Sequence, residues 1–157
     1  MGIEIERKFL VDHNKWRQLT KPVGTSYRQG YLANTGENTV RVRIAGSRGF
    51  ITIKGLTKGI SRKEFEYPIP VDDAAELLDD LAGPTVEKIR YRIDFEGHTW
   101  EVDEFSGDNE GLIIAEIELS DEAEAFKKPD WIADEVSSDE RYYNSNLSKN
   151  PYKNWGM

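Results

Sequence analysis

The stretch Ile3-Glu4-Ile5-Glu6-Arg7-Lys8-Phe9-Leu10 alternates between apolar and charged side chains, broken on its apolar face only by the arginine. Such a period of two predicts a β-strand with two unlike faces. Glu4, Glu6 and Lys8 share one face, and the two carboxylates are about 7 Å apart along the strand. At that spacing both carboxylates can reach one divalent cation or a closely spaced pair, and the lysine lies next in line for an anion. On this strand alone, charges on the wet face of an ordinary antiparallel sheet remain an alternative.

Composition narrows the class of protein. With 157 residues the chain is expected to form one domain, spanning 1–157, with a helical tail at about 121–157. The net charge of −8 argues against a nucleic-acid partner, but it leaves room for a small polyanion in an enclosed basic pocket. The sequence shows no signal-peptide pattern and no run of about 18 apolar residues, so we expect a cytoplasmic protein without membrane contact.

The content of cysteine and histidine narrows the kind of metal site. The chain has no cysteine and two histidines, His13 and His98. This excludes disulfides and thiolate ligands, and it disfavours a histidine-rich zinc site. A bound metal would therefore be held by oxygen ligands, as magnesium, manganese and calcium are.

Alternation, turn residues and helical spacing together predict the order of the elements. Glycine-containing turns, such as the one at 34–38, separate the strands, and apolar stripes at helical spacing mark the helices. We expect strands at 3–10, 26–32, 39–44, 50–54, 62–70, 85–93, 99–105 and 112–119. We expect helices at 12–20 and 72–82, capped by Asp12 and Asp72, and two short helices at 121–127 and 139–148.

The charged faces of these strands are sorted by sign. Basic residues recur at every second position in Arg41/Arg43 and Lys88/Arg90/Arg92, and Lys54 is a single basic residue on its strand. Acidic residues recur in the same way in Glu64/Glu66, Glu101/Asp103 and Glu116/Glu118. Like charges on one strand face repel, so a compensating arrangement is required. The simplest is a mainly β (α+β) fold, a closed antiparallel β-barrel whose lumen has an acidic and a basic side facing each other. The apolar faces then point outward, where the helices at 12–20 and 72–82 cover them. A flat sheet with one charged wet side is the alternative.

The expected lumen favours one class of ligand. Buried charges of both signs must be paired, hydrated or bound to metal. Carboxylates on one wall attract divalent cations, and guanidinium and ammonium groups on the other bind phosphate oxygens. A metal-bound polyphosphate satisfies both walls, which indicates hydrolysis or transfer of a phosphoryl or nucleotidyl group.

These motifs resemble the CYTH superfamily, also called triphosphate tunnel metalloenzymes. Glu4-x-Glu6-x-Lys8 is similar to the family's ExExK signature. The resemblance extends along nearly the whole chain, in the family's order and spacing, through Gln29-Gly30-Tyr31-Leu32, Arg41-Val42-Arg43, Lys54, Glu64/Glu66, Lys88-x-Arg90, Asp103, Ala115-Glu116-Ile117-Glu118-Leu119 and Arg141-Tyr142-Tyr143-Asn144-Ser145-Asn146-Leu147. It implies an eight-stranded tunnel, a magnesium- or manganese-dependent reaction at a small-molecule triphosphate, and commonly a homodimer.

The resemblance also implies roles for individual residues. Glu4, Glu6 and Lys8 form the expected catalytic motif. The metal-site candidates are Glu4, Glu6, Asp103, Glu116 and Glu118. The phosphate-binding candidates are Lys8, Arg41, Arg43, Lys54, Lys88 and Arg90, with Glu64 and Glu66 orienting basic neighbours. For each group, neutralisation by pairing across the tunnel is the alternative role.

Because the family hosts several activities on one scaffold, the fold does not select the substrate. We expect an inorganic triphosphatase that converts tripolyphosphate to pyrophosphate and phosphate, because the short chain shows charged tunnel faces and no evident aromatic pocket for a base. A CYTH-type adenylate cyclase, a thiamine or nucleoside triphosphatase, and a non-catalytic polyphosphate-binding module are the alternatives.

Overall fold

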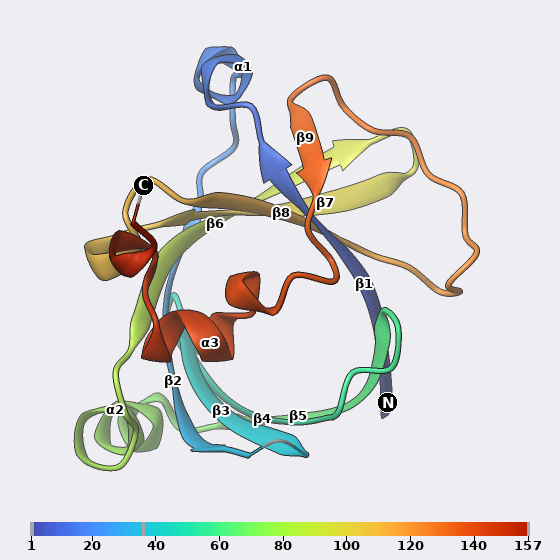
Figure 1. Ribbon diagram of the computed structural model, residues 1–157. Helices are drawn as coiled ribbons and strands as arrows, with labels where there is room; N and C mark the ends of the chain where they lie inside the picture. The colour runs from blue at the N-terminus through green and yellow to red at the C-terminus, as the bar shows by residue number, and fades with distance from the viewer. Residues whose placement is uncertain (1, 36, 157) are drawn as a thin grey trace.

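Eight antiparallel strands close into a barrel around a central tunnel (Figure 1). The computed structural model describes residues 2–35 and 37–156; the predicted turn at 34–38 includes position 36, which lies outside the described residues. The strands of the ring are β1 (Gly2–Val11), β2 (Thr25–Asn34), β3 (Asn38–Ala45), β4 (Arg48–Gly55), β5 (Ser61–Ile69), β6 (Val86–Phe95), β7 (His98–Phe105) and β8 (Ile113–Glu118). The predicted fold class is thus confirmed, and all eight predicted strands occur at nearly the expected positions.

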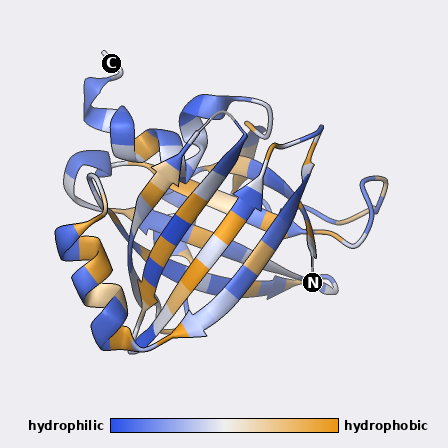
Figure 2. Ribbon diagram, turned by 90° about the horizontal axis from the view of Figure 1, so that it is seen from below, coloured by the Kyte–Doolittle hydropathy of each residue, from blue (hydrophilic) through white to orange (hydrophobic). Residues whose placement is uncertain are grey.

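The first strand closes the barrel. The order around the ring is β1-β5-β4-β3-β2-β6-β7-β8 and back to β1. Residues 2–5 of β1 pair with 61–64 of β5, and residues 6–10 pair with 114–118 of β8. Because side chains alternate along each strand, the charged set of β1 faces the tunnel and its apolar set faces outward. The same alternation is visible along the neighbouring strands (Figure 2).

A short ninth strand was not predicted. β9 (Ile132–Glu135) pairs with Phe9 and Val11 of β1, beyond the point where β1 leaves β5. The segment before it, predicted as a helix at 121–127, is irregular instead. Glu124 accepts hydrogen bonds from the Ser120 amide and hydroxyl, both at 2.6 Å, and lies 2.6 Å from His98 Nε2. These contacts hold the backbone in a turn, so the helix prediction is wrong.

Two helices cover the outer face of the barrel, as predicted. In α1 (His13–Gln18), Asp12 accepts a 3.1 Å hydrogen bond from the Lys15 amide and so caps the helix. Helix α2 (Val71–Asp80) begins one residue earlier than expected, with Pro70 in the capping position and no side-chain cap, so the prediction of Asp72 as the cap is wrong. It packs on β2, β3 and β4. Gly49 permits this contact, because a Cβ there would lie 2.9 Å from that of Ala74.

The hydrophobic core lies outside the tunnel, between the barrel wall and its coverings. Phe9, Trp16 and Trp100 are fully buried and Trp131 nearly so. Their rings meet edge to face, with centroids 5.1 Å apart for Trp16–Trp131 and 5.5 Å for Phe9–Trp100. Apolar burial on the outside leaves the interior of the barrel free for charged side chains.

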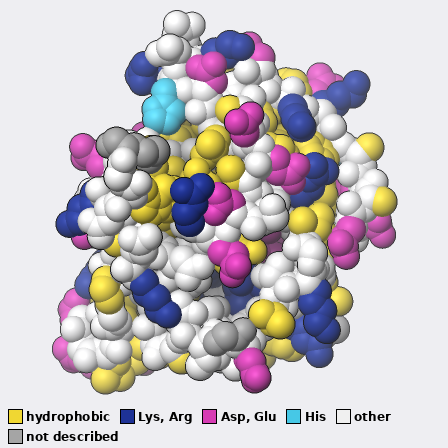
Figure 3. All heavy atoms as spheres, viewed as in Figure 1, with side chains coloured by type: hydrophobic (Ala, Val, Ile, Leu, Met, Phe, Trp, Pro, Cys, Tyr) yellow, Lys and Arg dark blue, Asp and Glu magenta, His cyan; other side chains and the backbone are white. Residues whose placement is uncertain are grey.

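The C-terminal tail folds back across one end of the barrel. The predicted helix at 139–148 is divided into η2 (Glu140–Tyr142) and α3 (Asn144–Lys149), with the backbone extended at Tyr143. Tyr142 and Leu147 are buried against Val86, Phe105 and neighbouring apolar residues. The remaining short helices are η1 (Gly107–Asn109) and η3 (Tyr152–Asn154). Helix α3 lies inside the ring of strands in Figure 1, and atoms of the chain cover most of this end in Figure 3.

No helix in the described part of the chain is both long and apolar enough to cross a membrane.

Candidate active site

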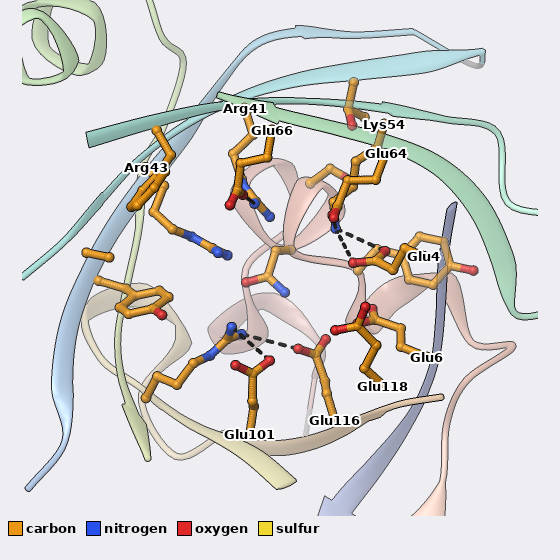
Figure 4. Close-up of a pocket in the computed structure, with 18 of the residues that line it drawn as sticks. Glu4, Glu6, Arg41, Arg43, Lys54, Glu64, Glu66, Glu101, Glu116 and Glu118 are labelled. Atoms are coloured by element: carbon orange, nitrogen blue, oxygen red, sulfur yellow. Dashed lines mark hydrogen bonds and ion pairs between the residues drawn. The ribbon is translucent and has the colours of Figure 1, made fainter. Parts of the chain in front are cut away.

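The tunnel contains a cavity of about 260 Å³ that is lined mostly by charged side chains (Figure 4). Strands β7, β8, β1 and β5 are consecutive in the ring and carry its carboxylates. Strands β4, β3 and β6 carry most of its lysines and arginines, with β2 between the last two. The predicted acidic and basic sides therefore face each other. The predicted site residues that line the cavity are Glu4, Glu6, Lys8, Arg41, Arg43, Lys54, Glu64, Glu66, Lys88, Arg90, Glu116 and Glu118.

Two carboxylates of the acidic side are held by lysines. Glu4 lies 3.1 Å from Lys54 Nζ and 3.3 Å from Arg62 Nε. Burial alone would raise the pKa of Glu4, but Lys54 and Arg62 outweigh it and lower that pKa to about 2. Glu116 lies 2.9 Å from Lys8 Nζ and 3.2 Å from Arg90 Nη2, and these cations likewise hold its pKa well below the ordinary value against the effect of burial.

Glu6 and Glu118, two further carboxylates of this side, lack such compensation. Burial and the negative charges of Glu116 and Glu4 raise the pKa of Glu6 to about 7, although Lys8 lies 3.8 Å away. Burial, Glu4 and Glu101 also raise the pKa of Glu118, which makes no ion pair within the described residues. Negative charge thus exceeds positive charge between β1 and β8. An added cation would relieve this excess.

Arg41 presents an unsatisfied donor at the basic side. Its Nη2 donates to Thr52 Oγ1 at 3.1 Å and lies 3.4 Å from Glu66 Oε2, but its buried Nε has no hydrogen-bond partner among the described residues. A buried N–H without an acceptor is costly. An anion in the cavity would provide that acceptor.

Arg43 has no carboxylate partner in the described part of the chain. Its Nε donates to the side-chain oxygen of Gln29 at 2.8 Å, and its guanidinium lies over the Tyr27 ring. Burial, together with the charges of Arg41 and Arg90, lowers the pKa of Arg43 to about 9. Positive charge is therefore in excess here, opposite the acidic excess between β1 and β8.

Asp103 lies behind the basic side rather than in the cavity. Its two oxygens accept hydrogen bonds from Arg90 Nε and Nη2 at 2.7 and 2.8 Å, and Lys88 Nζ lies 2.7 Å from the second oxygen. The side chain is 1% exposed, so no free oxygen faces the tunnel. Both oxygens of Asp103 are thus occupied by Arg90 and Lys88, and its role as a metal ligand stays a prediction. Its geometry orients Arg90 and Lys88.

Lys88 and Lys54 complete the predicted basic set. Burial lowers the pKa of Lys88 to about 7, since Arg90 and Arg43 counteract the attraction of Asp103. Lys54 bridges Glu4 and Glu64, whose oxygens lie 3.1 and 3.2 Å from its Nζ. Burial and the charge of Glu4 raise the pKa of Glu64. Glu64 and Glu66 thus contact the basic residues that they were predicted to orient.

Several cavity residues were not predicted. Glu101 lines the cavity and lies 3.3 Å from Arg90 and 2.9 Å from Arg92, which lines it as well. The tail contributes Tyr143, whose ring lies 5.5 Å from Lys8 Nζ, and Asn144. The further lining residues that carried no predicted role are Tyr27, Tyr31, Thr39, Ala45, Phe50, Arg62 and Ser145. No local signal in the tail indicates that it enters the tunnel.

The residues present fit a divalent cation of the magnesium or manganese type. All the acidic donors are carboxylate oxygens, which these ions prefer. Within residues 2–35 and 37–156, no three of them are already gathered as a metal cluster. Glu4 and Glu116 are drawn toward lysines, whereas Glu6 and Glu118 carry the uncompensated charge.

Comparisons with known proteins agree with this geometry. The profile of the CYTH domain matches residues 2–151. An inorganic triphosphatase of Acetivibrio thermocellus is 56% identical over 156 residues, covering 99% of both chains. One of Nitrosomonas europaea is 38% identical, covering 92% of this chain and 96% of the relative.

Solved structures agree as well. The crystal structure of an inorganic triphosphatase superposes with a TM-score of 0.64 at 35% identity, covering 92% of this chain and 96% of that one. A putative adenylate cyclase from Bacillus halodurans superposes with a TM-score of 0.61 at 18% identity, over 78% and 84% of the two chains. At that identity the second likeness concerns the fold alone.

Proposed function

The chain belongs to the CYTH domain family, and on that premise we propose that it is an inorganic triphosphatase, which hydrolyses tripolyphosphate to pyrophosphate and phosphate. The two curated relatives bear the name inorganic triphosphatase, one of them at 56% identity over nearly the full length. The observation that carries the proposal is the cavity itself, in which the poorly compensated carboxylates Glu6 and Glu118 face Arg43, which has no carboxylate partner among the described residues.

The shape of the tunnel supports a short substrate. The tail covers one end, where Tyr143, Asn144 and Ser145 line the cavity. The side chains around Lys88 and Arg43 therefore bind a ligand that enters from the other end. Tripolyphosphate is compact, highly charged and has no group to accommodate beyond its phosphates. A charged tunnel with one covered end suits such a ligand.

The basic side binds and orients the substrate. Arg41 has only a long contact of 3.4 Å with the Glu66 carboxylate, and Arg43 donates to Gln29 instead of a carboxylate. Arg90 is oriented by Asp103. Guanidinium groups pair with phosphate oxygens in bidentate fashion, so these residues would hold the chain of phosphates in line. Positive charge already in place stabilises the charge that grows on the bridging and leaving oxygens as water attacks a terminal phosphorus.

The acidic side would hold the divalent cation, Mg²⁺ or Mn²⁺. We propose Glu6 and Glu118 as its principal ligands, with Glu4 and Glu116 joining when the substrate draws their lysine partners away. Bound there, the cation would supply positive charge to the phosphate oxygens and acidity to the attacking water. Glu4, Glu6 and Lys8 thereby remain the proposed catalytic motif, and Asp103 does not join the ligand set.

Phosphate release tests the proposal. The full-length chain is incubated with tripolyphosphate or with ATP, each with Mg²⁺, with Mn²⁺ and with a chelator. We expect fast metal-dependent release from tripolyphosphate and slow release from ATP. Cyclic AMP and pyrophosphate from ATP would instead place the chain among the cyclases, and tight binding without turnover would make it a polyphosphate-binding module.

We also propose that the chain forms a homodimer. The outer faces of β4 and β5 expose Ile53, Phe65 and Tyr67 at 40%, 40% and 54%. Ile53 and Phe65 are cross-strand neighbours, so these side chains form one apolar surface. Light scattering of the purified chain measures the mass directly. A monomer at all concentrations would contradict this assembly, and Tyr67→Glu is expected to weaken it.

A further inference from the structure

Two neutral amides connect the tail to the basic side of the tunnel. Gln29 on β2 is fully buried although it is polar, and Asn144 is the first residue of α3. Gln29 Oε1 accepts the 2.8 Å hydrogen bond from Arg43 Nε, and Gln29 Nε2 lies 3.3 Å from both Tyr31 Oη and Asn144 Oδ1. Asn144 Oδ1 also accepts a 2.9 Å hydrogen bond from Lys88 Nζ. One continuous network therefore joins Arg43, Gln29, Asn144 and Lys88.

The chemistry of this network suits side chains that hold cations without neutralising them. A carboxylate beside Arg43 would neutralise its charge and compete with a phosphate oxygen for the same donors. An amide oxygen accepts the Nε–H bond and leaves the positive charge in place. Since the Nε bond sets the plane of the guanidinium group, the two terminal nitrogens stay directed at the cavity, which Arg43 lines.

The position of Asn144 gives the tail a role beyond covering one end. Lys88 already lies 2.7 Å from Asp103, and a single partner would draw the ammonium group away from the tunnel. Asn144 binds the same ammonium from the tail, so Lys88 is held between the barrel wall and α3. The side chain is 1% exposed, and this second contact fixes its direction.

We propose that Gln29 and Asn144 are positioning residues that orient Arg43 and Lys88 toward the bound triphosphate. This inference rests on the proposed function, because it names how that same site holds its substrate. It assigns no chemical step to either amide. Gln29 acts through Arg43 and Asn144 through Lys88, so the effect of each amide must disappear when its basic partner is replaced.

The test compares Gln29→Met with wild type in Mg²⁺-dependent tripolyphosphate hydrolysis, using the full chain. The substitution keeps the length of the side chain and removes its hydrogen bonds. We expect KM to rise about tenfold or more, with a smaller change in kcat, because a hydrogen bond to a charged group is lost. Gln18→Met, on the exposed face of α1, is the matched control and is expected to leave both constants unchanged.

A double-mutant cycle separates positioning from a merely structural role. In an Arg43→Ala background, Gln29→Met should raise KM little further. Equal effects in both backgrounds, or an unchanged KM in the single variant, would overturn the inference. If Gln29→Met fails to fold, Gln29→Glu decides: it keeps the shape, adds the competing charge and is expected to raise KM, whereas an unchanged KM refutes the argument.

Asn144 is tested in the same way. Asn144→Leu should raise KM in the wild-type background and not in a Lys88→Met background. Asn146→Leu, on the same helix but hydrogen-bonded to the Glu140 carbonyl, is its control. An equal increase for Asn144→Leu with and without Lys88 would overturn its positioning role.

Failure of the proposed function would be recognised separately. Calorimetric titration with tripolyphosphate measures affinity without turnover, so the variants can be compared even if wild type is inactive. Wild-type binding without hydrolysis would refute the triphosphatase activity alone. Hydrolysis with unchanged affinity and KM in the variants would refute the positioning roles alone.

Discussion

Glu6 and Glu118 lie directly opposite each other across the β1–β8 ladder. Like charges in opposite positions of an antiparallel pair repel, and these two are close to Glu4 and Glu116 as well. The sheet tolerates this pair at a cost in the metal-free state. We interpret that cost as the basis for the affinity of this site for a divalent cation.

The first prediction concerns Glu6 in chelator-treated protein. The pKa of Glu6 is about 7 in the folded state, against an ordinary value of 4.5, so folding favours the protonated carboxyl group. Its stabilising contribution is complete below about pH 4.5 and is lost as pH rises through 7. Glu6→Gln should therefore raise the free energy of unfolding by about 1 to 3 kcal/mol at pH 8 and leave it nearly unchanged at pH 4.

Denaturant unfolding at both pH values measures this effect. Glu110→Gln, at an exposed loop position, serves as control. The same Glu6→Gln variant should lose metal-dependent turnover while it melts cooperatively. A less stable variant at pH 8, or wild-type activity in a folded variant, would contradict the assignment of Glu6.

The second prediction is that Glu116→Gln has the opposite effect on stability. Glu116 compensates Lys8 at 2.9 Å and Arg90 at 3.2 Å, and all three are buried. Removing one partner leaves buried charge unpaired, so we expect a loss of about 3 kcal/mol at pH 8 without metal. Equal changes in Tm for the Glu6 and Glu116 variants would show that the two carboxylates share one environment, against the structure.

The third prediction concerns Arg41. Because its Nε lacks an acceptor among the described residues, Arg41→Ala should remove a group that gains a partner when the anion binds. We expect KM for tripolyphosphate to rise about tenfold to a hundredfold, with kcat affected less. Steady-state kinetics measures both constants, with Arg48→Ala at the exposed start of β4 as control. An unaltered KM would exclude Arg41 from phosphate binding.

The fourth prediction distinguishes Asp103 from a metal ligand. Asp103→Asn should weaken tripolyphosphate binding, because Arg90 and Lys88 lose the charge that orients them. The affinity for Mn²⁺ should stay within about twofold of wild type, well inside the tenfold that corresponds to 1.4 kcal/mol. Titration with Mn²⁺ by calorimetry measures this, with Glu6→Gln as the variant expected to lose affinity. A large loss of Mn²⁺ affinity in Asp103→Asn would restore its role as a ligand.

The local pattern of the chain was sufficient to predict the barrel. Each strand carries its own alternation, and the sorting of sign by strand requires that opposite charges meet around a closed ring. The prediction of a helix at 121–127 was wrong. Glu124 accepts a hydrogen bond from the Ser120 amide and contacts His98, and these contacts hold the backbone in a turn although the composition is typical of a helix. Strand β9 has four residues and little alternation of its own, so only its pairing with β1 defines it.

The sequence by itself determined which side chains face the tunnel, since alternation of side chains along a strand is a local property of the backbone. Tertiary structure alone decided what each of them meets there. Asp103 and Glu101 share one face of β7, yet the closure of the barrel presses Asp103 against Arg90 and Lys88 and leaves Glu101 in the cavity. The tail likewise makes contacts between distant parts of the sequence: Tyr143 lies more than a hundred positions from Lys8, and Asn144 more than fifty from Lys88. Contacts between residues so far apart in the sequence depend on the packing of the whole chain, and local periodicity carries no information about them.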